Sequence, residues 1–194
     1  MSVTRTTILK NAVLLFSQKG FNGVSMRNIA DLTKISAPAL YNHFKDKHTL
    51  YITAIAESFQ NKSANLLDAL NSQGKAIERL ERFITCLSEE LYNDPNFRRL
   101  MQRELLDGDE KRLQFLAQEV FGASFTKLMT LLKELKPAGE AHSLAIIIIG
   151  MVQKPFEISP LTKFFSEYQE EQITPPFVTQ QVMSILSTFL GEQK

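Results

Sequence analysis

Apolar residues recur at helical spacing along almost the whole chain, and this regularity constrains the fold more than any other feature. Ile8, Ala12 and Leu15, for example, follow the three-to-four-residue period of an amphipathic helix. No stretch shows the alternation of apolar and polar residues that marks a half-buried strand. Because 44% of the 194 residues are hydrophobic, the chain can bury a sizeable core, and we expect an all-α fold.

Capping residues and breakers divide this periodicity into separate helices. Ser25 and Ser36 are good N-caps, Gly20 is suited to end a helix, and Asp46 precedes a long apolar stripe. The stripes span 8–16, 26–32, 40–44, 50–70, 77–91, 97–106, 113–135, 142–152 and 177–190. We expect 113–135 to be one long helix, stopped by Pro137 and Gly139. Four prolines limit residues 155–176 to at most one short helix.

Residues 25–44 have the layout of two short helices joined by a three-residue turn, as in a helix-turn-helix. Such a unit needs apolar inner faces, which are supplied by Ile29, Ala30, Ile35, Leu40 and Phe44. Its second helix also needs a short outer face that can enter the major groove of DNA. That face carries Ala37, Ala39, Tyr41, Asn42 and His43. The pattern predicts a three-helix DNA-binding domain over residues 1–47, followed by a helical regulatory and dimerisation domain over 48–194.

Charge is distributed unevenly, although the net charge is only +1. Residues 1–50 carry seven Lys and Arg against two acidic residues, whereas residues 51–194 carry fifteen basic and nineteen acidic residues. A basic end on an acidic body is expected where one end meets the phosphates of nucleic acid. The partner that we expect is therefore double-stranded DNA.

Two stretches within residues 8–55 carry a resemblance to a known family. The first is Ala-x-x-x-Phe-x-x-x-Gly-Phe over 12–21, and the second is Leu-Tyr-x-His-Phe-x-x-Lys over 40–47. Together with Val24–Ala30, they resemble the tetracycline-repressor (TetR) family of transcription regulators. Beyond this part, only the helical pattern and the total length are similar.

The resemblance implies roles for individual residues in contacting DNA. Ser25 and Arg27 match positions that contact the DNA backbone or a nearby base. Ser36, Ala37 and Ala39 match the opening of the recognition helix, where the last two face base edges. Tyr41 and His43 match phosphate-contacting positions, and Lys47 matches a lysine whose ammonium and neighbouring N–H groups hold a phosphate.

The sequence departs from the family pattern at two places. Asn28 stands where the family commonly has an acidic residue, and we expect the capping box of the second helix to be weakened. Ala37 and Ala39 can contact a thymine methyl group but cannot form hydrogen bonds, so the base preference is left open.

The late helices are candidates for a homodimer interface. Residues 141–152 are apolar on nearly every side, and such a helix must be buried on every side. Pairing with the stripe of 177–190 across a two-fold axis would bury both, as in TetR relatives, and would suit a palindromic operator. Ordinary core packing of both helices is the alternative.

A small-molecule effector is implied by the family resemblance. Its site would be an apolar cavity lined by Phe83, Cys86, Met101, Phe121 and Phe125. Packed core is the plainer interpretation of the same residues. We expect a repressor that an apolar effector releases from its operator. The alternative function is a ligand-independent DNA-binding protein of chromosome organisation or division control.

Other classes of protein have little support in the sequence. Cys86 and His142 lack the acidic partner and oxyanion signature of a catalytic site, and we expect no enzyme and no cofactor. Three scattered histidines and one cysteine form no recognisable metal site. The longest apolar run, 144–152, is about half a membrane span, and no secretion signal is recognisable. We expect a soluble protein of a reducing cytoplasm.

Overall fold

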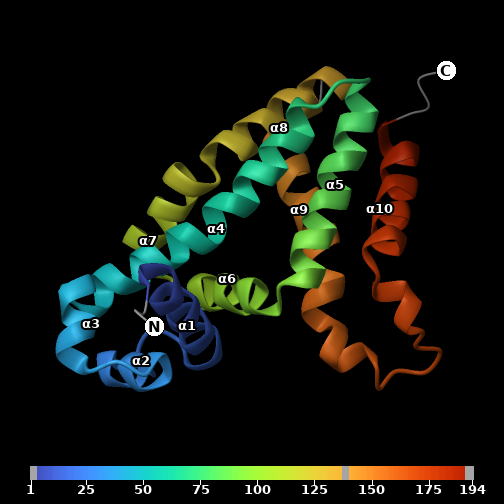
Figure 1. The fold of residues 1–194 in the computed structure, drawn as a ribbon. Coiled ribbons are helices and arrows are strands. Elements are labelled where there is room, and N and C mark those ends of the chain that lie inside the picture. Colours follow the sequence, from blue (N-terminus) through green and yellow to red (C-terminus); the bar gives the residue numbers. More distant parts are fainter. Residues whose placement is uncertain (1–3, 137–139, 191–194) are drawn as a thin grey trace. The chain divides into compact units, whose positions relative to one another are not determined.

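The computed structural model describes residues 4–136 and 140–190. In these ranges every regular element is a helix and no strand is present, so the prediction of an all-α fold is confirmed (Figure 1). Pro137 and Gly139, the predicted stop of a helix, lie outside the described residues. The α-helices are α1 (Arg5–Lys19), α2 (Met26–Thr33), α3 (Ala37–His43), α4 (Lys47–Asn71), α5 (Ala76–Asn93), α6 (Pro95–Asp107), α7 (Glu110–Phe115), α8 (Gly122–Leu135), α9 (Ala141–Thr162) and α10 (Pro175–Leu190).

The helices belong to two compact units, each with its own core. The first unit joins the chain up to Asn61 with Pro95–Val120, and the second joins Lys62–Asp94 with the chain from Phe121 onward. Helix α4 therefore contributes residues to both units. The first unit is larger than the predicted DNA-binding domain of residues 1–47, because α6 and α7 pack with it. That shorter boundary stays a prediction.

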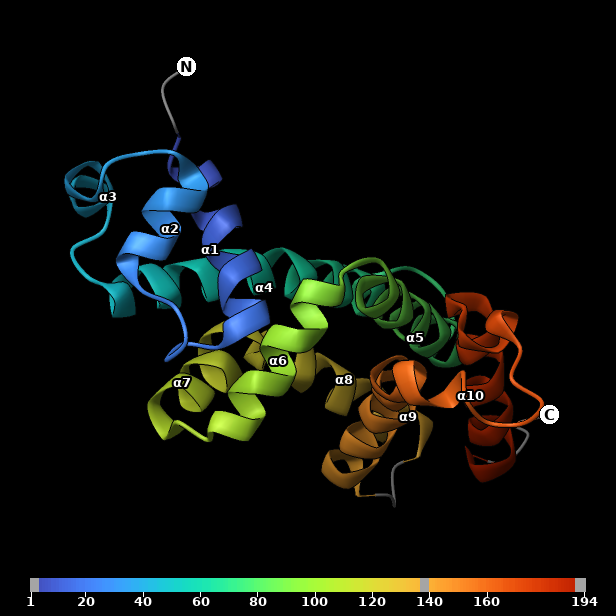
Figure 2. The same ribbon diagram turned by 90° about the horizontal axis from the view of Figure 1, so that it is seen from below.

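In the first unit, α1 is the central support of the helix-turn-helix. Its inner face, including Ile8 and Phe16, is fully buried. Helix α2 packs on one side of α1, and α6 packs along another, as both ribbon views show (Figures 1 and 2). The rings of Phe16 and Tyr51 meet edge to face, with centroids 4.6 Å apart. The early helices are thus fixed to the beginning of α4 by aromatic packing.

A buried ionic cluster joins α4, α6 and α7 within this unit. The side chain of Glu104, with no exposed surface, accepts a hydrogen bond from the Tyr51 hydroxyl and one from Arg112 Nε at 2.8 Å. Arg112 also forms ion pairs with Asp107 at 3.1 Å and Asp109 at 3.3 Å. Burial, together with the hydrogen bond to the Glu104 carboxylate, raises the pKa of Tyr51 and keeps its hydroxyl a donor. The charge of Glu104 is therefore compensated inside the protein.

The second unit is a helical bundle of α5, α8, α9 and α10 with the last part of α4. Helix α5 packs against α8, α9 and α10. Its buried face includes Phe83, Leu87 and Leu91, spaced at three to four residues as the sequence predicts. At the beginning of this part of α4, Lys62 forms ion pairs with Glu90 at 2.7 Å and Asp94 at 3.1 Å. These contacts hold the last part of α4 against α5.

The prediction of a single helix over 113–135 is wrong. After α7 the chain forms a π-helical turn at Leu116–Val120, and a new helix begins at Gly122. Arg112, Leu116 and Val120 are all buried, although they are spaced by four residues. Successive residues at this spacing drift around an ideal α-helix, whereas the wider π turn keeps them closer to one side. The π turn is therefore compatible with burial of all three side chains.

The expectation of at most one short helix over 155–176 is also wrong. Helix α9 continues through Pro155 and Pro160 to Thr162. Each proline removes one backbone hydrogen bond, which costs stability. On the same helix, Val152 and Phe156 are almost completely buried, and that burial favours continuing the helix through Pro155. A 3₁₀ turn at Glu170–Ile173 follows, and Pro175 begins α10 in the first turn, where a missing N–H is tolerated.

We expect Glu104→Ala to lower the free energy of unfolding by about 3 kcal/mol, because Arg112 would lose its most deeply buried partner. Chemical denaturation measures this change. Glu134→Ala is the matched control, since Glu134 is half-exposed in its ion pair with Arg79 and its loss should cost under about 1 kcal/mol. Equal losses in both variants would contradict the assigned importance of the buried cluster.

Candidate nucleic-acid interface

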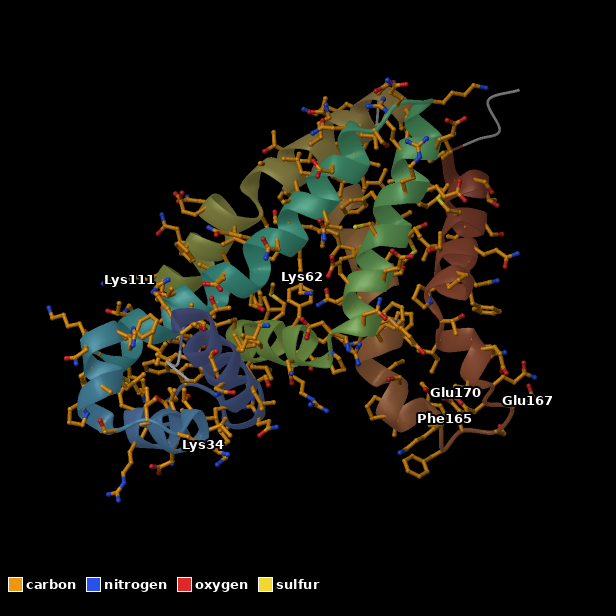
Figure 3. All side chains as sticks on the ribbon, in the orientation of Figure 1. Lys34, Lys62, Lys111, Phe165, Glu167 and Glu170 are labelled. Atoms are coloured by element: carbon orange, nitrogen blue, oxygen red, sulfur yellow. The ribbon has the colours of Figure 1, made fainter. Side chains whose placement is uncertain are left out.

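The turn between α2 and α3 has the geometry of a helix-turn-helix. Lys34, labelled in Figure 3, takes the left-handed conformation with φ 60° and ψ 42° and ends α2. The next residue, Ile35, donates its backbone N–H to Ala30 O at 3.1 Å. Ser36 then caps α3, with Ala39 N donating to its hydroxyl at 3.2 Å. The two helices are therefore joined by a tight, hydrogen-bonded turn, as the sequence predicts.

The N-terminus of α2 carries a complete capping box. Asn28 N donates to Ser25 Oγ at 3.1 Å, and Ser25 N donates to Asn28 Oδ1 at 2.9 Å. The box therefore forms with Asn28, and the expectation that it is weaker than one with an acidic residue stays a prediction. The carboxamide oxygen accepts the same hydrogen bond that an acidic side chain would accept. Ser25 and Arg27 are both exposed at this end of α2.

The two faces of α3 differ in the way that the sequence predicts. Leu40 and Phe44 are buried against the unit. Tyr41, Asn42 and His43 are exposed, and the relative exposure of Tyr41 is 51%. Ala37 and Ala39 are half-buried, while the capping residue Ser36 is exposed. A short polar outer face on a seven-residue helix can be presented to a groove of DNA. The contacts themselves stay predictions.

Lys47 has a structural role that the sequence pattern did not reveal. Its ammonium donates to Phe21 O at 3.0 Å and Val24 O at 3.1 Å, and it lies 4.2 Å from the centroid of the Phe21 ring. These contacts hold the loop between α1 and α2 against the start of α4. The predicted phosphate contact of Lys47 stays a prediction, and only one N–H of the ammonium is left for it.

The N-terminus of α4 already has an anionic partner within the chain. The Asp46 carboxylate accepts a hydrogen bond from Thr49 N at 2.7 Å, which lowers the pKa of Asp46. Asp46 therefore occupies one of the N–H groups that would otherwise face a phosphate.

The residues predicted to line an effector cavity fall in different parts of the fold. Met101 belongs to the first unit, whereas Phe83, Cys86, Phe121 and Phe125 belong to the second. Phe83 is buried and the other four are half-buried. The ring of Phe125 contacts His142 edge to face, with centroids 5.4 Å apart. No single unit contains all five residues, and their role in binding a ligand stays a prediction.

The only cysteine is not activated as a nucleophile. Burial, with help from nearby Glu90 and Glu89, raises the pKa of the Cys86 thiol to about 11. The thiol is therefore protonated at neutral pH. Across the described ranges, no group of three or more His, Cys, Asp or Glu side chains is arranged to hold a metal ion.

Helices α9 and α10 leave apolar side chains uncovered. Ile146 and Ile147 on α9, and Ile185 and Phe189 on α10, each expose more than half of their surface. The opposite faces are buried, including Ile148. Helix α9 is long and apolar enough to cross a membrane by length and composition, but one such helix is weak support for a membrane protein. The predicted homodimer interface at these helices stays a prediction.

Comparison with known proteins supports a regulatory role. Residues 8–54 match the family model for bacterial regulatory proteins of the tetR family. The biofilm operon icaADBC negative transcriptional regulator IcaR of Staphylococcus aureus is 30% identical over 77 residues, which are 40% of this chain and 41% of IcaR. The match thus spans about two fifths of the length of this curated relative.

Solved structures of regulators share the fold over nearly the whole chain. The fatty acid degradation regulator FadR from Bacillus halodurans covers 98% of this chain with a TM-score of 0.75 at 16% identity, and 100% of FadR is covered. FadR from Bacillus subtilis, solved in complex with stearoyl-CoA, matches with a TM-score of 0.76 at 17% identity. The match covers 94% of this chain and 97% of that FadR. By its helix-turn-helix and its family match, the part of the chain over residues 8–54 is a DNA-binding region of the tetR family of bacterial regulatory proteins, and the fold of the chain is similar to that of these solved regulators.

Proposed function

We propose that the protein is a cytoplasmic repressor that binds a palindromic operator as a homodimer and is released by an apolar small molecule. The single observation that carries DNA binding is the polarity of α3. Its inner residues Leu40 and Phe44 are buried, and its outer residues Tyr41 to His43 are exposed at the basic end of the chain. A helix with this arrangement can enter the major groove without exposing its apolar face.

The chemistry of each side chain indicates whether it would contact phosphates or bases in the proposed DNA interface. Arg27, Tyr41 and His43 can donate hydrogen bonds to phosphates and so fix the register of the protein on the duplex. Asn42 can bond the edge of an adenine, whereas Ala37 and Ala39 are limited to apolar contact with a thymine methyl. Ser25 and Ser36 mainly cap their helices and bring helix N-termini toward the backbone.

Homodimerisation is supported by the uncovered apolar residues of α9 and α10. Large aliphatic side chains that are more than half exposed on two neighbouring helices are costly in a monomer. Pairing the same surface of two copies across a two-fold axis would bury all of them in a four-helix arrangement. A two-fold protein then reads a two-fold operator.

Repression and effector control are supported by the relatives, together with the composition of the second unit. IcaR is a negative regulator, and FadR from Bacillus subtilis was solved with stearoyl-CoA. Half-buried Cys86, Phe121 and Phe125 could adapt to an apolar ligand in this unit. Helix α4 is continuous from Lys47 to Asn71. A ligand that displaces its buried Leu66 and Leu70 face would therefore also disturb the first turn of the helix, at Lys47.

Tyr41→Ala should weaken operator binding by about 1–3 kcal/mol, since an exposed phosphate-contacting group is removed without loss of core packing. Fluorescence anisotropy would be measured on a duplex that the wild-type protein selects from a random pool. Tyr168→Ala, which removes an exposed tyrosine of the second unit, is the matched control and should bind like wild type.

Lys47→Ala helps to interpret that result. It should lower both operator affinity and the free energy of unfolding, because Lys47 also holds Phe21 and Val24. Tyr41→Ala should lower affinity alone. If Tyr41→Ala binds as tightly as wild type at matched salt, α3 does not meet DNA in the proposed way.

Ile147→Lys should convert a dimer into a monomer or an aggregate, because it would bury an unpaired charge in the proposed interface. Sedimentation velocity at micromolar concentration, without DNA, measures the oligomeric state. Leu105→Lys, at a similarly exposed apolar residue of α6, is the control and should leave the dimer intact. If the wild-type protein is a monomer at this concentration, the proposed homodimer is contradicted.

An effector should lower operator affinity and raise thermal stability in the absence of DNA. A tenfold loss of affinity requires a coupling free energy of about 1.4 kcal/mol, within the range of allosteric regulators. A thermal-shift screen of apolar small molecules, and of long-chain acyl-CoA, which joins an apolar acyl chain to a charged coenzyme, would be followed by operator competition. Ligands that stabilise the protein but leave DNA affinity unchanged would contradict effector-controlled release and favour a ligand-independent DNA-binding protein.

A further inference from the structure

An open basin of about 480 Å³ lies in the first unit along the contact between α1 and α6. It is lined by Ser17, Gln18, Arg99, Gln102, Arg103 and Leu106, and we call it the α1–α6 basin. The two helices that form it run side by side in both ribbon views (Figures 1 and 2). None of the residues predicted to contact DNA or to line the apolar effector cavity belongs to it, although Arg99 and Arg103 could also accept an anionic group of an effector.

The spacing of residues on α6 explains why one side of this helix is a basin wall. Phe97, Leu100 and Glu104 form its buried face. The four lining residues, 99, 102, 103 and 106, follow the i, i+3, i+4, i+7 pattern of a different face. The lining therefore holds two guanidinium groups and two carboxamides beside Leu106, and it contains no carboxylate. The buried Ser17 hydroxyl already donates to Leu14 O at 2.8 Å and Asn96 Oδ1 at 3.0 Å. The guanidinium and carboxamide donors suit an oxyanion.

Arg103 is already engaged, but with neutral partners. Its Nε donates to Ser17 O at 3.0 Å and its Nη2 donates to Gln18 O at 2.6 Å, at the last turn of α1. A cation there is favoured by the exposed carbonyls of a helix C-terminus. Gly20 leaves room for this arrangement, because a Cβ there would lie 3.2 Å from Nη1 of Arg103. An oxyanion would be a stronger hydrogen-bond acceptor than either carbonyl.

Arg99 supplies the second charge. Its side chain is exposed at the basin, and no hydrogen bond or ion pair ties it to another residue of the described chain. Arg99 and Arg103 are four residues apart on one helical face, so both guanidinium groups can approach the same ligand. Like charges at this spacing repel each other, and an anion between them would relieve the repulsion.

We propose that the α1–α6 basin binds a small, multiply charged oxyanion through phosphate or carboxylate groups and that binding draws Arg103 away from α1. This role rests on the proposed function, since its consequence is a change in operator affinity. The last turn of α1 leads directly into the loop that Lys47 holds through Phe21 and Val24. Loss of the Arg103 contacts would loosen that loop and the N-terminus of α2 that follows it.

Direct binding is tested first, on the full chain without DNA. Pyrophosphate and citrate, as phosphate and carboxylate probes, are titrated by calorimetry in chloride buffer of constant ionic strength. The wild-type protein should bind at least one probe. Arg99→Gln should weaken that binding by about tenfold or more. Arg99→Lys should lose less binding affinity, because the positive charge remains. Lys133→Gln removes an exposed positive charge in the second unit and should bind like wild type. Equal affinities of wild type and Arg99→Gln, or no binding of either probe, would overturn the assignment.

Coupling to DNA is tested second, by exchanging chloride for the bound probe at fixed ionic strength. Operator affinity should fall by about fivefold or more in wild type and much less in Arg99→Gln. The probe also screens charges and competes with DNA phosphates at the DNA interface, but it does so equally in both proteins. A difference between the two proteins therefore reports on the α1–α6 basin. An equal fall in the two proteins would overturn the coupling.

The salt dependence of operator binding distinguishes a phosphate of DNA from a free anion as the ligand of Arg99. If Arg99→Gln without any probe reduces the slope of log affinity against log salt by about one, Arg99 contacts a DNA phosphate and the free-anion assignment is overturned. Failure of the proposed function is a separate result, in which wild type in chloride selects no duplex at all.

Discussion

Glu104 carries a negative charge at a position with no access to solvent, and the first unit is organised around this constraint. A buried carboxylate is tolerated only when other groups compensate its charge and satisfy its lone pairs. Arg112 and Tyr51 do so from α7 and α4, so three helices must meet at one point. Because Tyr51 lies one turn after Lys47, the beginning of α4 is held at this meeting point. The helix-turn-helix is thereby attached to a defined support rather than to a flexible linker.

The ring of Phe21 extends this support to the loop between α1 and α2. Lys47 Nζ lies 4.2 Å from its centroid, Arg112 Cζ lies 5.6 Å from it, and the Tyr51 ring packs at 4.9 Å. Two cations near one aromatic ring are favourable because its faces are electron-rich. The cations themselves are held apart by other partners: Arg112 by carboxylates and Lys47 by backbone carbonyls. These contacts hold the loop between α1 and α2 in place at the start of α2.

The helix-turn-helix could be predicted from sequence because its signals are local. Ser25, Ser36 and the spacing of Leu40 and Phe44 each act within a few residues. The role of Lys47 could not be predicted, since backbone carbonyls as acceptors leave no residue pattern. Glu104 did leave a signal, because an acidic residue on the apolar stripe of Phe97 and Leu100 indicates a buried partner. Its identity required the fold, as Tyr51 is 53 residues away.

The composition of α3 limits how much sequence selectivity one copy can provide. Ala37 and Ala39 offer no hydrogen bonds to bases, and the helix has only seven residues. A thymine methyl contact discriminates less than a bidentate hydrogen-bonded pair, which is worth about 1–3 kcal/mol. On the proposed function, Asn42 is the residue of α3 that can form such a pair, so much of the selectivity must come from two copies engaging half-sites at the correct spacing. Affinity that depends on spacing is sensitive to small displacements of the helix-turn-helix. A regulator of this kind needs only a modest change at its support, in the contacts of α1 with α6 or of α4 with its neighbours, to lose its operator.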